Sequence, residues 1–425
     1  MKILIKNGRV IDPENKIDEV LDILIEDSKI VKVSKDIKID VDKEINAQDR
    51  IVIPGLVDMH VHLREPGRED KETVCSGTKA ALHGGVTSVL AMPNTFPATD
   101  SIENVKALKE IIRKNAKASV FIVGAITKNR SGQELTDIAG LKKEGAIAIS
   151  DDGASVDSEG LMLEAFKLAG REGILVICHS EDKSLSLSGV VNLGLTSTRL
   201  GLRGISKESE YKRIDRDIEL AKIAKAKVHI AHISCLESVE IIAKAKKSGV
   251  KVTAETCPHY FALNEEAVLG YDTNFKMNPP LRTKQDMLAI QQALASGIID
   301  VISSDHAPHT ENEKDIEFER AEFGVTGLET ELAVAITELV NKGIIDWNDL
   351  VRRMCLNPSR ILGLNKGTLS KGADADIVIV DPKKEFTVNK EYFISKSKNS
   401  PFILRKLKGF LEHTIIQGKV YKWNS

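Results

Sequence analysis

The middle of the chain alternates between short apolar runs and longer stretches with a helical period. Eight apolar runs have the length of buried strands, and most are separated by patterns in which apolar residues recur every three to four positions. The strand candidates are 51–57, 87–92, 119–123, 146–150, 174–178, 228–231, 251–256 and 300–303. The helix candidates are 101–114, 158–171, 217–225, 236–247 and 284–295. Eight strands in alternation with helices predict a parallel α/β barrel of the (β/α)8, or TIM, type.

The two ends of the chain have a different pattern, with short strands joined by tight turns. Near the start, Asn7-Gly8 and Asp27-Ser28 have the composition of turns between strand-like runs. Near the end, the strand-like run 414–416 is followed by a Gln417-Gly418 turn. Neither end has enough apolar residues for a core of its own, so we expect them to pair. The expected organisation is a small β-sandwich domain composed of 1–49 and 366–425, and a barrel of residues 50–365.

Composition supports a large enzyme-like domain and excludes several other classes. The chain has 425 residues, of which 42% are hydrophobic, enough to bury a full barrel core. Lysine and arginine number 60 against 62 acidic residues, so nothing indicates nucleic acid or an anionic membrane as a partner. No apolar run reaches the roughly 18 residues that a membrane helix needs. The five scattered cysteines predict a reduced, cytoplasmic setting.

Two connections are longer than simple links between barrel elements. One covers 184–213, a candidate lid, and the other covers 307–323 after the eighth strand candidate. Long loops in compact domains are usually functional or disordered. Both would lie at the carboxyl ends of the strands, where barrel enzymes hold their chemistry. No G-x-G-x-x-G phosphate loop follows an early strand, which favours the barrel over a doubly wound nucleotide-binding sheet.

Residues that commonly bind metals follow five of the strand candidates. Alternate side chains of an extended strand share a face, so His60 and His62 can hold one ion. The carboxyl ends of barrel strands meet at one rim. Imidazoles and carboxylates together suit zinc, with manganese or cobalt as substitutes, and predict two cations bridged by a carboxylate and a hydroxide. The full set is His60, His62, Asp151 or Asp152, His179, His232 and Asp305.

Strand parity selects between neighbours on two of these strands. On the fourth strand candidate the alanines share a face with Asp152, and the isoleucines share a face with Asp151. Small residues fit a crowded barrel interior, so we expect Asp152 to bridge the metals and keep Asp151 as the alternative. On the sixth strand candidate, His229 and His232 fall on opposite faces. Because His232 is nearer the carboxyl end, we interpret His229 as structural.

Six segments carry a resemblance to one known family. They are 58–67 (DMHVHLREPG), 92–95 (MPNT), 150–153 (SDDG), 231–234 (AHIS), 276–282 (KMNPPLR) and 304–309 (SDHAPH). Over nearly its whole length the chain resembles the cyclic-amide branch of the amidohydrolase superfamily. It is most similar to the dihydroorotases of the long-chain (class I) bacterial and archaeal type.

The resemblance implies an activity and a set of metal ligands. The activity is the reversible cyclisation of N-carbamoyl-L-aspartate to (S)-dihydroorotate and water, in the de novo biosynthesis of pyrimidines (UMP). Asp152 and a hydroxide would bridge two zinc ions, and Asp305 would shuttle the proton as well as touch one metal. The implied metal-binding residues are His60, His62, Asp152, His179, His232 and Asp305.

It also implies a substrate site. The residues implied to hold the substrate carboxylate are Arg64, Asn94 and His309, and His62 would lie against the substrate as well. An arginine fork matches a carboxylate in a bidentate way. The residues implied to contact the ring are Asn278, Phe323 and Gly324. We expect no direct role for His306. We expect His259 and Tyr260 to pack behind the ligands or to support them, and Lys276 and Arg282 to be solvated charges.

Two other functions compete with this interpretation. Allantoinases and hydantoinases, by family resemblance, bridge their metals with a carbamylated lysine near the end of the fourth strand, whereas residues 146–152 contain no lysine. A non-catalytic scaffold is disfavoured because every expected ligand is intact. By family analogy, we expect a homodimer or an association with other pyrimidine-pathway enzymes.

Overall fold

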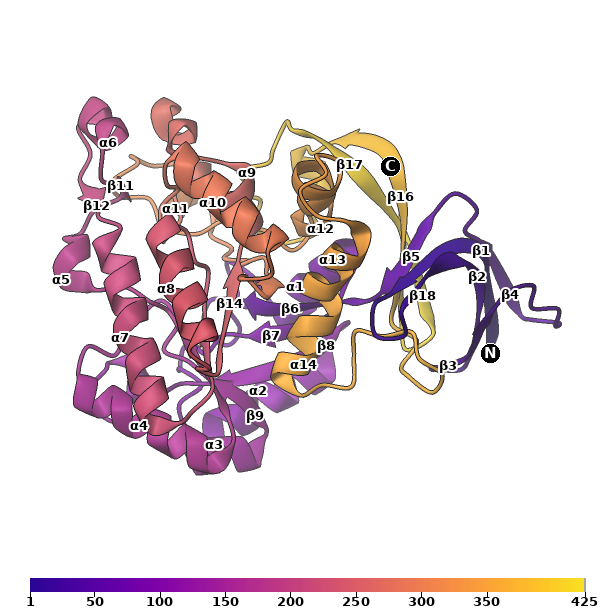
Figure 1. The fold of residues 1–425 in the computed structure, drawn as a ribbon, viewed down its shortest axis with the longest axis horizontal. Helices are drawn as coiled ribbons and strands as arrows, with labels where there is room; N and C mark the ends of the chain where they lie inside the picture. Colours follow the sequence, from indigo (N-terminus) through magenta and orange to yellow (C-terminus); the bar gives the residue numbers. More distant parts are fainter. Residues whose placement is uncertain (424–425) are drawn as a thin grey trace.

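The computed structural model describes residues 1–423, and its central part is a barrel of eight parallel strands (Figure 1). The strands follow one another around the barrel in chain order, which confirms the predicted (β/α)8 architecture. Between the last and first strands, a parallel bridge joins Val61 to His306, and the amide of His62 donates to the carbonyl of His306 at 2.9 Å. The strands are β6 (Leu56–Val61), β7 (Val86–Ala91), β8 (Ser119–Gly124), β9 (Ala146–Ile149), β10 (Leu175–Cys178), β13 (Val228–Ile230), β14 (Val252–Thr256) and β15 (Val301–Ile302).

Apolar side chains alternate between the two faces of the barrel. The interior core comprises Met59, Leu90, Val123, Ala148, Ile177 and Val301. The residues that neighbour these in sequence point outward and pack against the helices; they include Val89, Ile149, Val176 and Ile302. This period of two is the geometry of a strand buried on both faces. Polar side chains lie mainly at the carboxyl ends of the strands.

Helices cover the outside of the barrel (Figure 1). The connecting helices are α1 (Val74–His83), α2 (Ile102–Asn115), α3 (Ile138–Glu144), α4 (Glu159–Glu172), α7 (Glu208–Ala224), α8 (Leu236–Lys247) and α10 (Lys284–Ala295). Several begin where a hydroxyl side chain accepts a hydrogen bond from a first-turn amide, as Ser101, Ser158 and Thr283 do. The last helical segments are α12 (Glu331–Ala335), η4 (Ile336–Val340), α13 (Trp347–Val351), η5 (Arg352–Leu356) and α14 (Asn357–Leu362).

Both ends of the chain contribute to a second eight-stranded sheet, which lies to the right of the barrel in Figure 1. Its path is β18 (Lys419–Lys422), β17 (Lys406–Ile416), β16 (Ile377–Thr387), β5 (Ile51–Pro54), β1 (Lys2–Asp12), β2 (Ile17–Glu26) and β3 (Lys29–Ser34), with β4 (Lys43–Asn46) beside β1. The sheet surrounds a separate apolar core drawn from both ends, which includes Ile5, Ile23, Ile377 and Ile415. The expected pairing of the two ends is confirmed.

Two local predictions at the start of the chain were wrong. The apolar run 51–57 is two strands: β5 pairs with β1 and β16 in the terminal sheet, and β6 begins the barrel. Gly55 lies at the break, where a Cβ atom would overlap the side chain of Thr87, so only glycine lets the chain pass. The Asn7-Gly8 pair is an irregularity inside β1 rather than a turn between strands. The hairpins at Asp27-Ser28 and Gln417-Gly418 are confirmed by the pairs Glu26–Lys29 and Ile416–Lys419.

The two long connections contain regular structure. The stretch 184–213 includes α5 (Lys183–Ser186), β11 (Val191–Asn192), α6 (Leu195–Leu200), β12 (Gly204–Ile205) and the first turns of α7, which begins earlier than predicted. After β14 lie α9 (Pro258–Ala262), η2 (Glu265–Gly270) and η3 (Thr273–Phe275), and the loop after β15 contains α11 (Glu311–Lys314). Two further single turns are η1 (Lys128–Arg130) and η6 (Lys390–Tyr392). Within residues 1–423, no helix combines the length and the apolar character needed to cross a bilayer.

Candidate active site

Four histidines surround the carboxylate of Asp152 at the carboxyl rim of the barrel. His60 Nε2 lies 3.2 Å from Asp152 Oδ1, and His62 Nε2 lies 3.5 Å from Oδ2. His179 Nδ1 and His232 Nε2 lie 3.5 and 3.8 Å from Oδ1. The five side chains come from the ends of β6, β9, β10 and β13, and all are buried. Parallel strands bring residues that are far apart in sequence to one rim.

Asp305, just after β15, adds a second carboxylate to this cluster. Its Oδ1 lies 3.2 Å from His62 Nε2 and 3.5 Å from His60 Nε2. The residue adopts a left-handed backbone with φ of 48°, a conformation uncommon outside glycine that is concentrated at functional sites. Burial would raise the pKa of Asp305, but the neighbouring histidines outweigh it and lower the pKa to about 2. The side chain is therefore ionised at neutral pH and able to accept a proton.

The donor set fits divalent cations. Ligand atoms of His60, His62 and Asp305 lie within 4.8 Å of one another, and so do those of His60, Asp152 and His232. Three buried atoms of this cluster have no hydrogen-bond partner among the described residues: His60 Nε2, Asp152 Oδ1 and His232 Nδ1. Buried polar atoms normally have partners, so these atoms point to a missing ligand. Neutral imidazoles with carboxylates are donors that zinc prefers.

The two neighbouring aspartates after β9 have different surroundings. Asp151 accepts hydrogen bonds from the backbone amides of Ile126 and Thr127, at 2.8 and 3.0 Å, and from the Thr127 hydroxyl. These contacts fix the loop that follows β8. Asp152 instead faces the four histidines, and the histidines hold its pKa well below the usual value although burial opposes this. The geometry therefore favours Asp152 over Asp151 as a metal ligand.

Glu255 on β14 orients one of the histidines and was missed by the sequence analysis. Its Oε1 lies 2.6 Å from His60 Nδ1, and its Oε2 lies 3.2 Å from His229 Nε2 and accepts a 2.8 Å hydrogen bond from Ser303. A carboxylate on Nδ1 leaves Nε2 free to bind a metal. His229 contacts Glu255 and Thr253 rather than the cluster. The signal in the sequence that could have found Glu255 is a charged residue within the strand candidate 251–256.

A cavity of about 380 Å³ adjoins the cluster and contains the expected substrate residues. The residues lining it are His62, Arg64, Arg68, Lys71, Asn94, Arg130, Asp152, Gly153, His179, His232, Asn278, Asp305, Ala307, His309, Glu322, Phe323 and Gly324. Its volume suits a small molecule. Its lining combines carboxylates and imidazoles with cationic side chains.

Arg64 is the central cation of this cavity. Its Nε donates to the carbonyl of Pro308 at 3.2 Å, and its Nη2 lies 3.4 Å from His309 Nε2. Burial lowers its pKa to about 10, so the guanidinium stays charged at neutral pH. Among residues 1–423 no carboxylate lies within ion-pair distance of it. An unpaired guanidinium in a cavity is a site for an anion.

The remaining expected residues lie around Arg64. Asn94 accepts a 2.8 Å hydrogen bond at Oδ1 from His62 Nδ1, which leaves His62 Nε2 directed at the cluster. Asn278, which also lines the cavity, donates from Nδ2 to Glu181 Oε2 at 3.1 Å. His309 Nε2 lies 2.8 Å from the carbonyl of Phe323. The cavity thus presents hydrogen-bond donors together with metal-type ligands.

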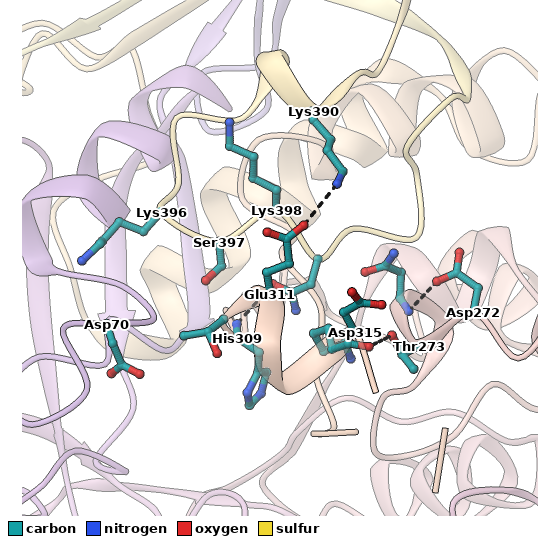
Figure 2. Close-up of a pocket in the computed structure, with 14 residues that line it drawn as sticks. Asp70, Asp272, Thr273, His309, Glu311, Asp315, Lys390, Lys396, Ser397 and Lys398 are labelled. Carbon is teal, nitrogen blue, oxygen red and sulfur yellow. Dashed lines mark hydrogen bonds and ion pairs between the residues drawn. The ribbon is translucent and has the colours of Figure 1, made fainter. Parts of the chain in front are cut away.

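A second cavity, of about 620 Å³, shares His309 with the first. Figure 2 shows it between α11 and the segment 396–399, with Lys390 directed at Glu311 across a 3.7 Å ion pair. Asn399 of this segment is buried and donates to the carbonyls of Ala307 and Gly324, at 3.3 and 3.0 Å. Its Oδ1 accepts from the amide of His309 at 3.2 Å. The C-terminal segment therefore supports both loops of the first cavity.

Several candidates have other partners. His306 pairs with Glu72 at 3.3 Å. Lys276 and Arg282 were expected to be solvated, but both are buried, with exposures of 2% and 3%. Lys276 donates to the carbonyls of Phe318 and Glu319, at 2.8 and 3.0 Å, because only buried acceptors can replace lost water.

Other contacts account for the remaining sequence candidates. Arg282 donates to Asn192 at 2.9 Å and pairs with Glu210 at 3.3 Å. The hydroxyl of Tyr260 donates to the carbonyl of Pro279 at 2.6 Å. His259 is buried beside Cys257 and Asp305, with its ligand atom within 4.8 Å of theirs.

The comparisons with known proteins match this geometry. Residues 49–238 match the family described as "Dihydro-orotase-like". The chain is 54% identical over 420 residues to the dihydroorotase of Elusimicrobium minutum, with 99% of this chain and 97% of that protein covered. It is 49% identical to the dihydroorotase of Geotalea daltonii, with 99% of each covered.

Among solved structures, the chain is similar to an L-hydantoinase (dihydropyrimidinase) from Arthrobacter aurescens. The TM-score is 0.90 at 26% identity, over 98% of this chain and 95% of that one. A dihydropyrimidinase from Brevibacillus agri matches with a TM-score of 0.86 at 24% identity, over 100% and 95%, and this likeness shows the fold. High identity over the whole length decides the family: the chain belongs to the dihydroorotase family of amidohydrolases.

Proposed function

We propose that this chain interconverts N-carbamoyl-L-aspartate and (S)-dihydroorotate in pyrimidine biosynthesis. The relatives named dihydroorotase share 46–54% identity with it over nearly the whole chain. One observation carries the proposal: the unpaired Arg64 guanidinium and a cluster of metal-type ligands line the same 380 Å³ cavity. A substrate with a carboxylate beside a cyclic amide needs both features in one site.

We propose two zinc ions as the cofactor. The geometry supports one ion held by His60, His62, Asp152 and Asp305, and another held by Asp152, His179 and His232. When bound, such ions supply a Lewis acid for the amide carbonyl and lower the pKa of a water. The proposal predicts roughly two zinc ions per chain on metal analysis. Less than about one bound ion after reconstitution would support a non-catalytic scaffold instead.

The chain's own residues then have distinct tasks in ring opening. Asp305 accepts the proton from the attacking water and donates it to the ring nitrogen as the carbon–nitrogen bond breaks. Arg64, Asn94 and His309 hold the carboxylate at the other end of the cavity. In ring closure Asp305 transfers the proton in the opposite sense and water leaves.

Asn278 and the Phe323–Gly324 backbone would contact the ring in this proposal. Asn278 already has one amide hydrogen on Glu181, so its carbonyl oxygen and second hydrogen are available for a substrate. The backbone of Gly324 has φ of 129°, which a larger residue would not adopt without strain. A Cβ there would also crowd His309 and Ala307.

A hydantoinase-type or allantoinase-type activity is the second candidate, because solved hydantoinases have the same fold. Residues 146–152 offer no lysine as a bridging group, which favours the first candidate. The test is one metal-loaded preparation assayed with dihydroorotate, carbamoyl-aspartate, allantoin and hydantoin. Turnover of the first pair is expected. Turnover of only allantoin and hydantoin would overturn the proposal.

We also propose a cytoplasmic enzyme that forms a homodimer or associates with other enzymes of the pathway. The five cysteines are all unpaired thiols, which supports a reducing setting. Light scattering during gel filtration of the zinc-loaded chain measures its mass directly. A single chain mass would count against the homodimer.

A further inference from the structure

Lys71, which the sequence analysis did not single out, contacts one of the expected substrate residues. It lies in the segment between β6 and α1 and is buried, with an exposure of 4%. Its Nζ lies 3.0 Å from His309 Nδ1 and 2.9 Å from Glu313 Oε1. A lysine ammonium has three hydrogens to donate and no lone pair. At the contact with His309, Lys71 is therefore the donor and Nδ1 is the acceptor.

This contact decides where the hydrogen of the imidazole lies. A neutral histidine has one donor nitrogen and one acceptor nitrogen. If Nδ1 accepts, then Nε2 carries the hydrogen. The nearest partner of Nε2 supports this assignment, because the carbonyl of Phe323, at 2.8 Å, can only accept a hydrogen bond. The longer 3.4 Å approach of the Arg64 guanidinium to Nε2 is then a contact between two donors that face the same space.

Charge around the ring supports its neutral form. Burial, together with the positive charges of Arg64, Lys71 and Lys314, lowers the pKa of His309 to about 2. Glu313 acts in the opposite sense, with Oε2 3.6 Å from Nδ1, and it also pairs with Arg68 at 2.7 Å. Lys71 lies between these groups and uses Glu313 as its counterion.

We propose that Lys71 is a positioning residue that sets the tautomer of His309, so that the ring presents an N–H donor to an anionic substrate. This inference rests on the proposed function in one respect, the carboxylate at Arg64. With Nε2–H the ring hydrogen, which lies on the carbonyl of Phe323 in this structure, can also be shared with a carboxylate bound at Arg64. With the opposite tautomer, Nε2 would direct a lone pair at that anion and repel it.

Loss of Lys71 leaves Nδ1 facing Glu313, whose charged carboxylate competes with the neutral carbonyl of Phe323 for the ring hydrogen. The ring would then place a hydrogen on Nδ1. Without Lys71, the imidazole of His309 can carry hydrogens on both nitrogens at lower pH. At higher pH it would keep the hydrogen on Nδ1 and lose the one on Nε2. The structure therefore assigns a pH-dependent loss of substrate affinity to the Lys71→Met variant, and none to the native chain over the same range.

The test combines nitrogen-15 spectra of the zinc-loaded protein with kinetics. The native His309, assigned by comparison with His309→Asn, should show an acceptor-type Nδ1 and a protonated Nε2. Lys71→Met should show a protonated Nδ1. Its KM for dihydroorotate should rise about tenfold or more near pH 8.5, the effect of one lost hydrogen bond to a charged group, with kcat changed less than about threefold.

Two further variants separate tautomer control from a merely structural role. Lys71→Arg keeps a donor-only cation and should retain the native spectrum and KM. Lys71→Met combined with Glu313→Gln removes the competing carboxylate and should restore part of the affinity. Lys390→Met is the matched control, because this exposed lysine lies across the second cavity from His309 (Figure 2) and should change neither readout.

The outcomes distinguish this inference from the proposed function. A native His309 with a protonated Nδ1, or a Lys71→Met variant with native spectrum and KM, would overturn the role of Lys71. A native chain that does not turn over dihydroorotate would refute the proposed function, while the spectra would still report the tautomer. Zinc content equal to that of the native chain is expected in every variant.

Discussion

At the scale of single residues, Asp305 combines strain, charge and position. Its backbone φ of 48° directs the carboxylate at His60 and His62 rather than along the strand. Histidine neighbours keep its pKa at about 2 against the effect of burial, so the ionised form persists over the whole neutral range. The ionised carboxylate beside the histidines supports the proposed role of Asp305 as the group that accepts a proton from the attacking water.

We predict that Asp305→Asn retains most of the bound zinc and loses about 10²–10⁴-fold in kcat, the usual contribution of positioned proton transfer. Metal analysis and steady-state kinetics on dihydroorotate measure the two effects. Asp315→Asn, an exposed aspartate on the same loop, is the control and should have native activity. Near-native turnover in Asp305→Asn would show that another group moves the proton.

Glu255 contacts His60, one of the proposed metal ligands. The short 2.6 Å contact with Nδ1 fixes the ring, and contacts with His229 and Ser303 fix the carboxylate in turn. We expect Glu255→Gln to weaken zinc binding about 10–100-fold, because a neutral amide is a poorer acceptor and cannot satisfy all three donors. Competition with a chelator measures the affinity. An unchanged zinc affinity would restrict Glu255 to packing.

At the scale of elements, the local pattern was sufficient for most strands and helices. The helix expected at 101–114 is Ile102–Asn115, because its serine cap and apolar stripe are both local signals. The break between β5 and β6 was not predictable, since an apolar run carries no mark of where the chain changes sheets. That break depends on contact between Gly55 and Thr87, which are distant in sequence.

The residues of the candidate site also divide into those that the sequence could predict and those that it could not. Histidines at strand ends could be predicted to gather, because the barrel topology alone brings strand ends together. Lys71, Glu255 and Asn399 were missed, since their importance lies in contacts that no local pattern encodes. Asn399 is 90 residues from His309, in a segment that belongs to neither a strand nor a helix.

The segment that contains Asn399 is the basis of a prediction at this scale. Asn399 bonds to the backbones of Ala307, His309 and Gly324, so it holds the two loops of the substrate cavity in register. Asn399→Ala should raise KM for dihydroorotate several-fold and increase hydrogen exchange in 307–309 and 323–325. Lys398→Ala, an exposed neighbour, is the control. Native exchange in both loops would contradict this role.

At the scale of the whole molecule, the terminal sheet and the barrel are continuous through Gly55. The division into a domain of 1–49 with 366–425 and a barrel of 50–365 stays a prediction. The pairing of β5 with β1 and β16 indicates that the N-terminal part of the sheet extends to Pro54. One face of the terminal sheet has its own core around Ile5, whereas residues such as Ile53 and Val378 belong to the large core that also contains the outer face of the barrel.

The proposed metal ligands lie at the ends of five barrel strands, so binding of cations there should affect the stability of the whole chain. Without cations, buried imidazoles and carboxylates such as His60 and Asp152 keep atoms without partners, which costs folding free energy. A ligand that binds only the folded state stabilises it by about 4 kcal/mol at about 1,000 times its Kd. Calorimetry with zinc or a chelator should therefore show a higher Tm with zinc. His179→Asn should reduce this difference, whereas His413→Asn, on β17 of the terminal sheet, should preserve it. An equal Tm in zinc and chelator would mean that the cluster folds as a closed polar network and binds no structural cation.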